Sequence, residues 1–216
     1  MGESIKRIVG PYQDSYSPNG IIGEKDACGV GFIANIQGMQ CNWILKQSLK
    51  GLNCMEHRGG CGGDSDSGDG AGILCSIPWT FLDEQMNLKN NNNYERGLGM
   101  IFMPNKKEKI EECKSICDEE ATKLSVKQTF WRNVPVDNEI LGPLAKANAP
   151  FIIQWILYLD KKDNNDVEKL LFQLRKRIEK KIKETSKNQV EECEFYFASL
   201  SSNTVVYKGM VRSEIL

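Results

Sequence analysis

Short strand-like runs and a few long helical repeats make up this chain, and their order limits the fold more than any other feature. Apolar runs and period-two alternation predict strands at residues 28–36, 73–77, 97–103, 129–136, 151–159, 193–201 and 204–211. Apolar residues at helical spacing predict helices at residues 43–57, 106–124 and 164–186. The order β-α-β-β-α-β-β-α-β-β lacks the steady βαβ alternation of doubly wound nucleotide-binding folds, and no GxGxxG follows the first strand. We therefore expect an α+β fold in which helices pack on antiparallel sheet.

The two later helices each carry an apolar stripe. The stripes consist of Ile110, Cys113, Cys117, Ala121 and Leu124 in the first, and Val167, Leu170, Leu171, Leu174, Ile178 and Ile182 in the second. Asn164 or Asn165 can cap the second helix. Its basic residues within 175–187 lie off the stripe and toward the C-terminus, where the helix dipole favours cations. A solvated face explains them better than a nucleic-acid surface.

The composition limits which partners and which cellular compartment are expected for the protein. The 216 residues suffice for one domain with a real core, and a formal net charge of −1 gives no reason to expect nucleic acid or acidic lipid. The most apolar run, residues 151–159, is too short to span a bilayer. Residues 1–27 hold no apolar signal segment and lack the Arg- and Ser-rich, acid-poor character of a transit peptide. These features favour the cytoplasm over secretion and leave a plastid open.

The cysteines do not form a metal-binding pattern. The chain has eight cysteines, no CxxC pair and one histidine, His57, whereas structural zinc sites show closely spaced ligand pairs. We read His57 as a helix-end residue. The other cysteines, apart from Cys28, are expected to pack in the interior, namely Cys41, Cys54, Cys61, Cys75, Cys113, Cys117 and Cys193.

Cys28 stands between a polar leader and the run "GVGFIA". If the leader is removed after Ala27, Cys28 carries both a thiol and a free α-amine. The amine has an ordinary pKa of about 7.7–8.0, so part of it is neutral at physiological pH and can serve as general base for the adjacent nucleophile. The same residue would then supply nucleophile and base, and the leader would block the base until it is cleaved.

The segment "HRGGCGGDSDSGDGAGI", residues 57–73, is the second informative stretch. Its glycines allow the backbone to wrap a small ligand, and Arg58 offers a bidentate cation for a carboxylate. The spacing of Asp64, Asp66 and Asp69 invites a calcium interpretation, but the loop lacks the later bidentate Glu, and without GK[ST] it is not a P-loop. From the residues alone, a purely structural glycine-rich turn stays open.

The residues "CGVGFIA" and "LKGLNCMEHRGGCGGDSDSGDGAGILCSIP" together resemble the start of the large subunit of glutamate synthase. Later pieces such as "WRNVPV", "LG" at 141–142 and "FYFASLSSNTVVYKGM" fit the same family in the same order. The resemblance implies a class II glutamine amidotransferase domain with an αββα sandwich of the N-terminal-nucleophile hydrolase type. It divides the chain into a leader, residues 1–27, and the N-terminal part of that domain, residues 28–216.

The resemblance also implies a reaction. The Cys28 thiolate would attack the side-chain amide of L-glutamine, with Arg58 and Gly59 lining the pocket, and the ammonia would pass to 2-oxoglutarate in downstream synthase domains of the same polypeptide. No cofactor is expected in this segment. FMN and an iron–sulfur cluster are expected in those downstream domains, with electrons from NAD(P)H or ferredoxin.

Two features of the family pattern lie downstream of "YKGM": the arginine for the glutamine α-carboxylate and the Asn-Gly pair of the oxyanion hole. Loss of one oxyanion donor lowers rates by about 10²–10³ in other enzymes, so little turnover is expected from residues 1–216 alone. The alternatives are another class II amidotransferase, a non-catalytic remnant that packs against partner domains, and a metal-binding module.

Overall fold

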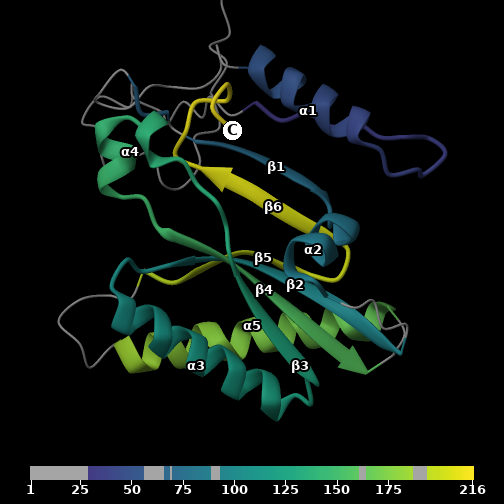
Figure 1. Ribbon diagram of the computed structural model, residues 1–216, viewed down its shortest axis with the longest axis vertical. Helices are drawn as coiled ribbons and strands as arrows, with labels where there is room; N and C mark the ends of the chain where they lie inside the picture. Colours follow the sequence, from purple (N-terminus) through teal and green to yellow (C-terminus); the bar gives the residue numbers. More distant parts are fainter. Residues whose placement is uncertain (1–28, 56–65, 69, 89–92, 161–163, 187–193) are drawn as a thin grey trace, which may run out of the picture.

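The computed structural model describes residues 29–55, 66–68, 70–88, 93–160, 164–186 and 194–216 (Figure 1). Its helices are α1 (Asn42–Cys54), α2 (Trp79–Met86), α3 (Lys107–Lys123), α4 (Pro143–Ala147) and α5 (Asn164–Ser186), with a 3-10 turn, η2 (Asn138–Ile140). Its strands are β1 (Ala71–Ser76), β2 (Tyr94–Met103), β3 (Gln128–Asn133), β4 (Phe151–Asp160), β5 (Tyr196–Ser201) and β6 (Thr204–Gly209).

The described strands form two sheets, and all their pairings are antiparallel. One sheet has the order β3-β4-β2-β5, and the other pairs β1 with β6. The long central strands β2 and β4 pair from Tyr94↔Asp160 to Met103↔Phe151. Because layers cover both faces of these strands, their burial is nearly continuous rather than alternating.

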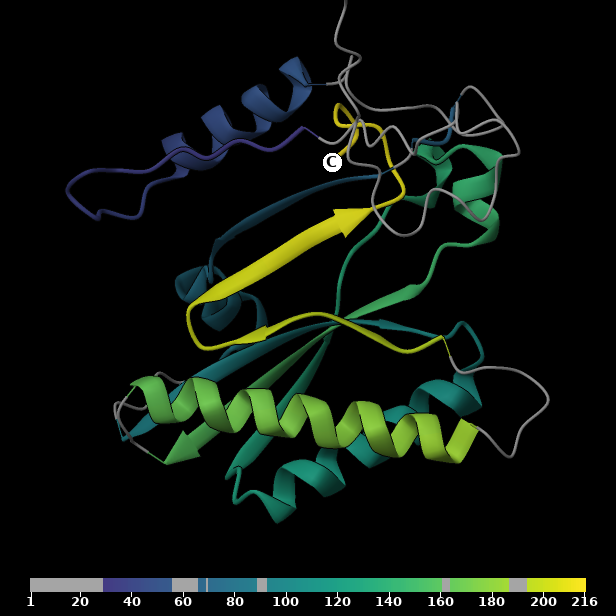
Figure 2. The same ribbon diagram turned by 180° about the vertical axis from the view of Figure 1, so that it is seen from behind.

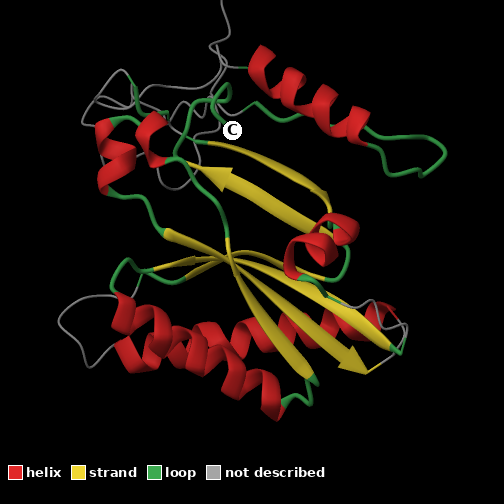
Figure 3. Ribbon diagram, viewed as in Figure 1, coloured by secondary structure: helices red, strands yellow, loops and turns green. Residues whose placement is uncertain are grey.

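The layers run helix, sheet, sheet, helix. Helices α3 and α5 cover one face of the four-stranded sheet, β1 and β6 lie over its other face, and α1 lies beyond them (Figures 1 and 2). One hydrophobic cluster fills the space between α3, α5 and the sheet, and a second lies between the two sheets. The expected α+β fold with αββα layering of antiparallel sheets is therefore confirmed, and Figure 3 shows these layers by element type.

The stripes of the two long helices are confirmed as core. Burial is complete or nearly so for Ile110, Cys113, Cys117, Ala121, Val167, Leu171, Leu174, Ile178 and Ile182. The stripe members Leu124 and Leu170 are half-buried at its border. Regular 3.6-residue spacing over several turns explains why the sequence predicts these helices well.

The strand predicted at 28–36 is wrong for its described part. Residues 29–35 have no regular secondary structure, and Val30 and Phe32 are 92% and 94% exposed. None of the described strands pairs with this segment. Alternating apolar residues do not hold a strand without a partner that satisfies its backbone hydrogen bonds.

Helix α2 is absent from the sequence-based expectation, and β2 begins earlier than expected. The sequence predicts this strand only from residue 97, but Tyr94 already belongs to β2. Helix α2 spans two turns and buries only Leu82 fully, so it leaves little periodicity to detect. Arg96 on β2 anchors it, since its Nη1 donates to Asp83 Oδ1 at 2.6 Å and its guanidinium lies 4.1 Å from the Trp79 ring centre.

The cysteine predictions hold only in part. Cys113 and Cys117 are buried in the core as expected, and Cys75 is half-buried between the sheets. Cys41 and Cys54, at the two ends of α1, are exposed, so the prediction that they pack in the interior is wrong. They lie on the outermost layer, where no described element covers them. Cys61 and Cys193 lie outside the described residues.

A buried carboxylate joins the two core helices. Glu120 of α3 is 4% exposed, and its oxygens accept hydrogen bonds from Lys123 Nζ at 2.6 Å and from Arg177 Nε of α5 at 2.8 Å. These bonds, first that of Lys123 and then that of Arg177, lower the pKa of Glu120 from 4.5 to about 2. The ionised form is therefore favoured in the folded protein.

We expect Glu120→Gln to make the free energy of unfolding depend less on pH at acid pH. A pKa that is lower in the folded than in the unfolded state contributes stability above pH 4.5, which is lost as the pH falls toward 2. The wild-type free energy of unfolding should therefore fall more steeply than that of the variant across this window, in urea titrations at stepped pH. At pH 7 the variant should be less stable by about 1 kcal/mol. Glu111→Gln, an exposed carboxylate on the same helix, is the control, and parallel profiles for Glu120→Gln and wild type would refute the prediction.

Candidate functional site

The predicted site residues Cys28, Arg58 and Gly59 lie outside the described residues, as does His57. The structure does describe the chain on both sides of them: Gly29 directly follows Cys28, and Met55 precedes Arg58 by three residues. The segment after Gly59 is described again from Asp66. The candidate site is therefore characterised through these flanking residues and the elements that hold them.

Gly29 and Met55 are packed together. A Cβ added at Gly29 would lie 3.1 Å from Met55 Sδ and 3.3 Å from Met55 Cβ, so a larger residue would push against this side chain. Met55 is the C-cap of α1, and its backbone N–H donates to Leu52 O at 2.9 Å. The end of α1 thus lies against the residue that follows Cys28.

The far end of the glycine-rich segment is held at Ser67. This serine is 2% exposed, and its Oγ accepts a hydrogen bond from the backbone N–H of Ala145, in α4, at 3.0 Å. Gly142, at the start of α4, leaves room for it, because a Cβ there would lie 2.5 Å from Ser67 Oγ and 2.6 Å from the carbonyl carbon of Asp66. The sequence alone does not single out Ser67, and it marks Gly142 only through the "LG" pair at 141–142, a piece of the family pattern.

Gly68 is held on the other side by the C-terminal part of the chain. A Cβ at Gly68 would lie 2.5 Å from the backbone nitrogen of Arg212 and from the carbonyl carbon of Val211. Arg212 forms an ion pair with Glu214, and its Nε is buried without a hydrogen-bond partner among the described residues. Ser67 and Gly68 are therefore buried between the start of α4 and residues 211–212.

Two motif segments of the resemblance form one ladder. Strand β1, which contains "AGILCS", pairs with β6, "TVVYKG", from Ala71↔Gly209 to Ser76↔Thr204. Gly70 directly precedes this ladder and has a φ of +136°, a backbone conformation that residues other than glycine rarely adopt. The glycine-rich stretch therefore enters β1 by a turn that depends on glycine at this position.

Three hydrogen-bonded polar side chains cross the interior between the two sheets. Arg132 Nη1 donates to Gln154 Oε1 at 2.8 Å, and Gln154 Nε2 donates to Tyr207 Oη at 3.3 Å. Gln154 is 1% exposed, so these bonds satisfy an amide that would otherwise be costly to bury. Burial also raises the pKa of Tyr207, which keeps its phenol protonated. These side chains are structural support under β6 and offer no acid or base near neutrality.

Two of the described interior thiols, Cys75 and Cys117, are poor nucleophiles. Burial raises the pKa of Cys75, and burial followed by the nearby Asp118 carboxylate raises that of Cys117 well above 9.0. Since the thiolate is the reactive form, both are suited to packing rather than to catalysis.

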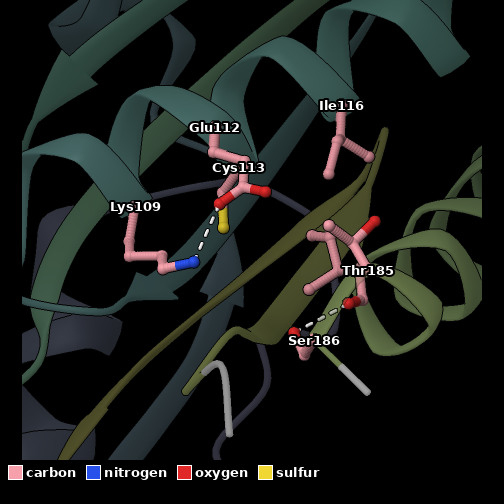
Figure 4. A pocket seen from close by; sticks show the side chains of 7 residues that line it. Lys109, Glu112, Cys113, Ile116, Thr185 and Ser186 are labelled. Atoms are coloured by element: carbon pink, nitrogen blue, oxygen red, sulfur yellow. Dashed lines mark hydrogen bonds and ion pairs between the residues drawn. The ribbon is translucent and has the colours of Figure 1, made fainter. Parts of the chain in front are cut away.

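Neither of two cavities found among the described residues could hold a substrate next to a reactive side chain. The one between α3 and α5, lined by Cys113, Ile116, Ile182 and neighbours, holds about 10 Å³, room for roughly one water (Figure 4). A hollow of about 440 Å³ between the 34–37 turn and the start of α1 is lined by Asn35, Gln37 and apolar side chains. The first space is too small for a substrate, and the lining of the second holds no acid, base or thiol, so neither provides an active site.

The described ranges also bear on metal binding and membrane insertion. Within them, no group of three or more His, Cys, Asp or Glu side chains could hold a metal ion. None of the helices in those ranges is long and apolar enough to cross a bilayer.

Gly142→Ala should destabilise the enclosed segment. The added methyl would overlap Ser67 Oγ and the Asp66 backbone, and the backbone cannot rotate away as a flexible side chain can. We expect a loss of about 1–3 kcal/mol in the free energy of unfolding, measured by urea titration.

Gly51→Ala is the matched control for this prediction. Gly51 lies in α1, and among the described residues no atom outside the helix's own nearby backbone and its chain neighbours lies within 4 Å of an added Cβ, so the higher helix propensity of alanine should raise stability by about 0.5–1 kcal/mol. Equal effects of the two substitutions would show that residues 66–68 do not pack on Gly142.

Comparison with known proteins gives one consistent family. The sequence family described as "Glutamine amidotransferases class-II" matches residues 28–216. The chain is 41% identical over 210 residues to the chloroplastic ferredoxin-dependent glutamate synthase of rice, Oryza sativa subsp. japonica, covering 95% of this chain and 13% of that protein. It is 41% identical to the ferredoxin-dependent glutamate synthase of Antithamnion sp., covering 91% and 13% of the two chains. It is 40% identical to ferredoxin-dependent glutamate synthase 2 of Synechocystis sp., covering 91% and 12%. The chain thus spans about an eighth of the length of these relatives.

Proposed function

The chain belongs to the class II glutamine amidotransferases, and on that basis we propose that it is the glutaminase part of a glutamate synthase. The family match begins at Cys28, and these relatives are glutamate synthases rather than other amidotransferases. The proposal makes Cys28 the first residue of the working protein, with residues 1–27 as a leader that is removed and residues 28–216 as part of the amidotransferase domain.

In the proposed reaction, Cys28 supplies both the nucleophile and the general base. The Cys28 sulfur forms a bond to the side-chain carbonyl carbon of glutamine, the carbon–nitrogen bond breaks, and ammonia leaves. The freed α-amine takes the thiol proton and returns it to the departing nitrogen. Water then cleaves the γ-glutamyl thioester, which releases glutamate and restores the thiol. Arg58 and Gly59 line the pocket in this proposal, with the Arg58 guanidinium facing the substrate.

The observation that carries the proposal is the contact between Gly29 and Met55. It joins the chain immediately after Cys28 to the chain just before Arg58, although the two are separated by more than twenty residues. A nucleophile and a pocket segment must lie within reach of one substrate to act together. The burial of Ser67 and Gly68 against α4 and residues 211–212 holds a later part of the glycine-rich stretch and supports the proposal further.

The wider reaction is proposed for the whole polypeptide. The relatives are named as ferredoxin-dependent, which favours ferredoxin over NAD(P)H as electron donor, with 2-oxoglutarate as ammonia acceptor. FMN and an iron–sulfur cluster would be held by other domains of that polypeptide. Chloroplastic relatives, such as that of rice, favour a plastid location.

The test follows the N-terminus and the activity together. Intact-protein and peptide mass spectrometry of the native polypeptide should find molecules that begin at Cys28. Glutamine-dependent ammonia release should rise in proportion to that fraction. Activity in preparations that retain Met1 would contradict the role of the free amine. Low turnover by residues 1–216 alone remains a prediction, and the native polypeptide is the comparison for it.

A further inference from the structure

Exposed apolar side chains gather in residues 29–45 more than in any other part of the described chain. Seven of the sixteen exposed large hydrophobic side chains of the described residues lie there, namely Val30, Phe32, Ile33, Ile36, Met39, Trp43 and Leu45. Residues 29–36 contain no charged side chain. Apolar surface in water is unfavourable, and a large exposed apolar patch marks an interaction site. A partner for this surface must therefore offer apolar side chains rather than charges.

The backbone of residues 29–34 is open as well. None of these residues belongs to a described strand, and no hydrogen bond joins their backbone to another described residue. The first such bond comes in the following turn, from Gly38 N–H to Asn35 O at 3.0 Å. Phe32 and Ile33, neighbours that would point to opposite faces of an extended strand, are both exposed. Apolar side chains on both faces and an unpaired backbone are typical of a strand from the interior of a sheet.

The elements next to this segment lack cover in the same region. Strands β1 and β6 pair only with each other among the described strands, and Leu74 of β1 is exposed. Helix α1 has no fully buried residue, and a hollow of about 440 Å³ lies between the 34–37 turn and the side chains of Trp43 and Ile44. Independent stability of a sheet takes three or more strands or a helix packed on it. The outer sheet and residues 29–34 thus share a need for further strands.

We propose that residues 29–34 and α1 form the docking surface for a later segment of the same polypeptide, which pairs with residues 29–34 as a β-strand and covers Val30 and Phe32. The inference rests on the proposed function, because that function places this chain in a polypeptide of about eight times its length, as in its relatives. The unpaired backbone favours an extended occupant over a helix. The lack of charge in residues 29–36 argues against nucleic acid or an anionic lipid surface.

Photocrosslinking in the native polypeptide identifies the occupant. The crosslinking amino acid p-benzoylphenylalanine replaces Phe32 in one variant and Phe172, which is 61% exposed on α5, in the matched control. After irradiation and digestion, mass spectrometry should find position 32 joined to one peptide that follows residue 216 in the same chain. The yield at position 32 should exceed that at position 172 on the order of tenfold, because a packed side chain stays close to one partner.

Hydrogen exchange of the wild-type polypeptide supplies a second readout that needs no substitution. The amides of residues 30–34 should exchange at least about 100-fold more slowly than those of an unstructured peptide of the same sequence, because strand pairing protects them. Exchange at the unstructured rate would overturn the strand pairing, whatever the crosslinks show.

The remaining outcomes separate the occupants. Crosslinks between two chains would identify a second copy as the occupant and overturn the proposal, and so would scattered products with equal yields at positions 32 and 172. Absence of Cys28-dependent glutamine hydrolysis would overturn the proposed function alone, since a crosslink from position 32 to a later peptide would still establish the docking surface.

Discussion

Cys28→Ala in the native polypeptide should lower glutamine hydrolysis by at least about 10³-fold, because the substitution removes the atom proposed to attack the amide. The loss should appear in kcat, and glutamine should still bind, since the proposed pocket residues Arg58 and Gly59 are unchanged. Measurement of ammonia and glutamate release at saturating glutamine distinguishes a lost chemical step from weakened binding.

Cys75→Ala is the control for this prediction. Its thiol is half-buried between the sheets, and burial raises its pKa, so its removal should leave the rate within about twofold. Loss of hydrolysis in both variants would indicate general damage to the fold. Retention of hydrolysis in Cys28→Ala would show that another group performs the reaction.

Trp155→Ala should lower the free energy of unfolding by about 3–5 kcal/mol, the cost of emptying a large site in the core. Trp155 is fully buried in β4 and stacks on Trp131 of β3, with ring centres 5.2 Å apart and planes within 15°. Its Nε1 donates to Asp118 Oδ1 at 3.3 Å, while Trp131 Nε1 donates to the other oxygen at 3.0 Å. The substitution would therefore leave a cavity and remove one donor from a carboxylate on α3.

Two further variants separate these contributions in urea titrations. Trp155→Phe keeps most of the packing and should lose about 1–3 kcal/mol, from the missing N–H and the smaller ring. Trp43→Ala changes a side chain of α1 that is 63% exposed and should alter stability by no more than about 0.5 kcal/mol. A small effect of Trp155→Ala would mean that the sheet between α3 and β6 is not packed as described.

The sequence predicts an element well when the pattern that marks it lies within the element's own residues. Helix α5 and strand β4 carry long, regular apolar patterns, so their positions and buried faces can be predicted from the residues themselves. The segment at 28–36 alternates equally well, but a strand needs a neighbour, and a pattern does not say whether one is present. Helix α2 is too short to show a period, and its stability comes from Arg96 on another element.

The residues of the candidate site also differ in how well the sequence alone indicates them. Cys28 and Arg58 stand out because each is followed directly by glycine in a distinctive motif, and the family match covers both. Ser67 and Gly142 carry no such signal, since a serine among glycines and an "LG" pair are common. Their importance depends on a contact between Ser67 and Gly142, far apart in the sequence, that only the three-dimensional arrangement reveals.

The central claim is that Cys28, with its freed amine, forms a covalent intermediate with glutamine. Rapid acid quenching of the native polypeptide during turnover, followed by peptide mass spectrometry, measures this directly. We expect the peptide that begins at Cys28 to carry a γ-glutamyl group on sulfur, and the adduct to disappear when glutamine is exhausted. Turnover with an unmodified Cys28 peptide, or with the adduct on another cysteine, would contradict the claim.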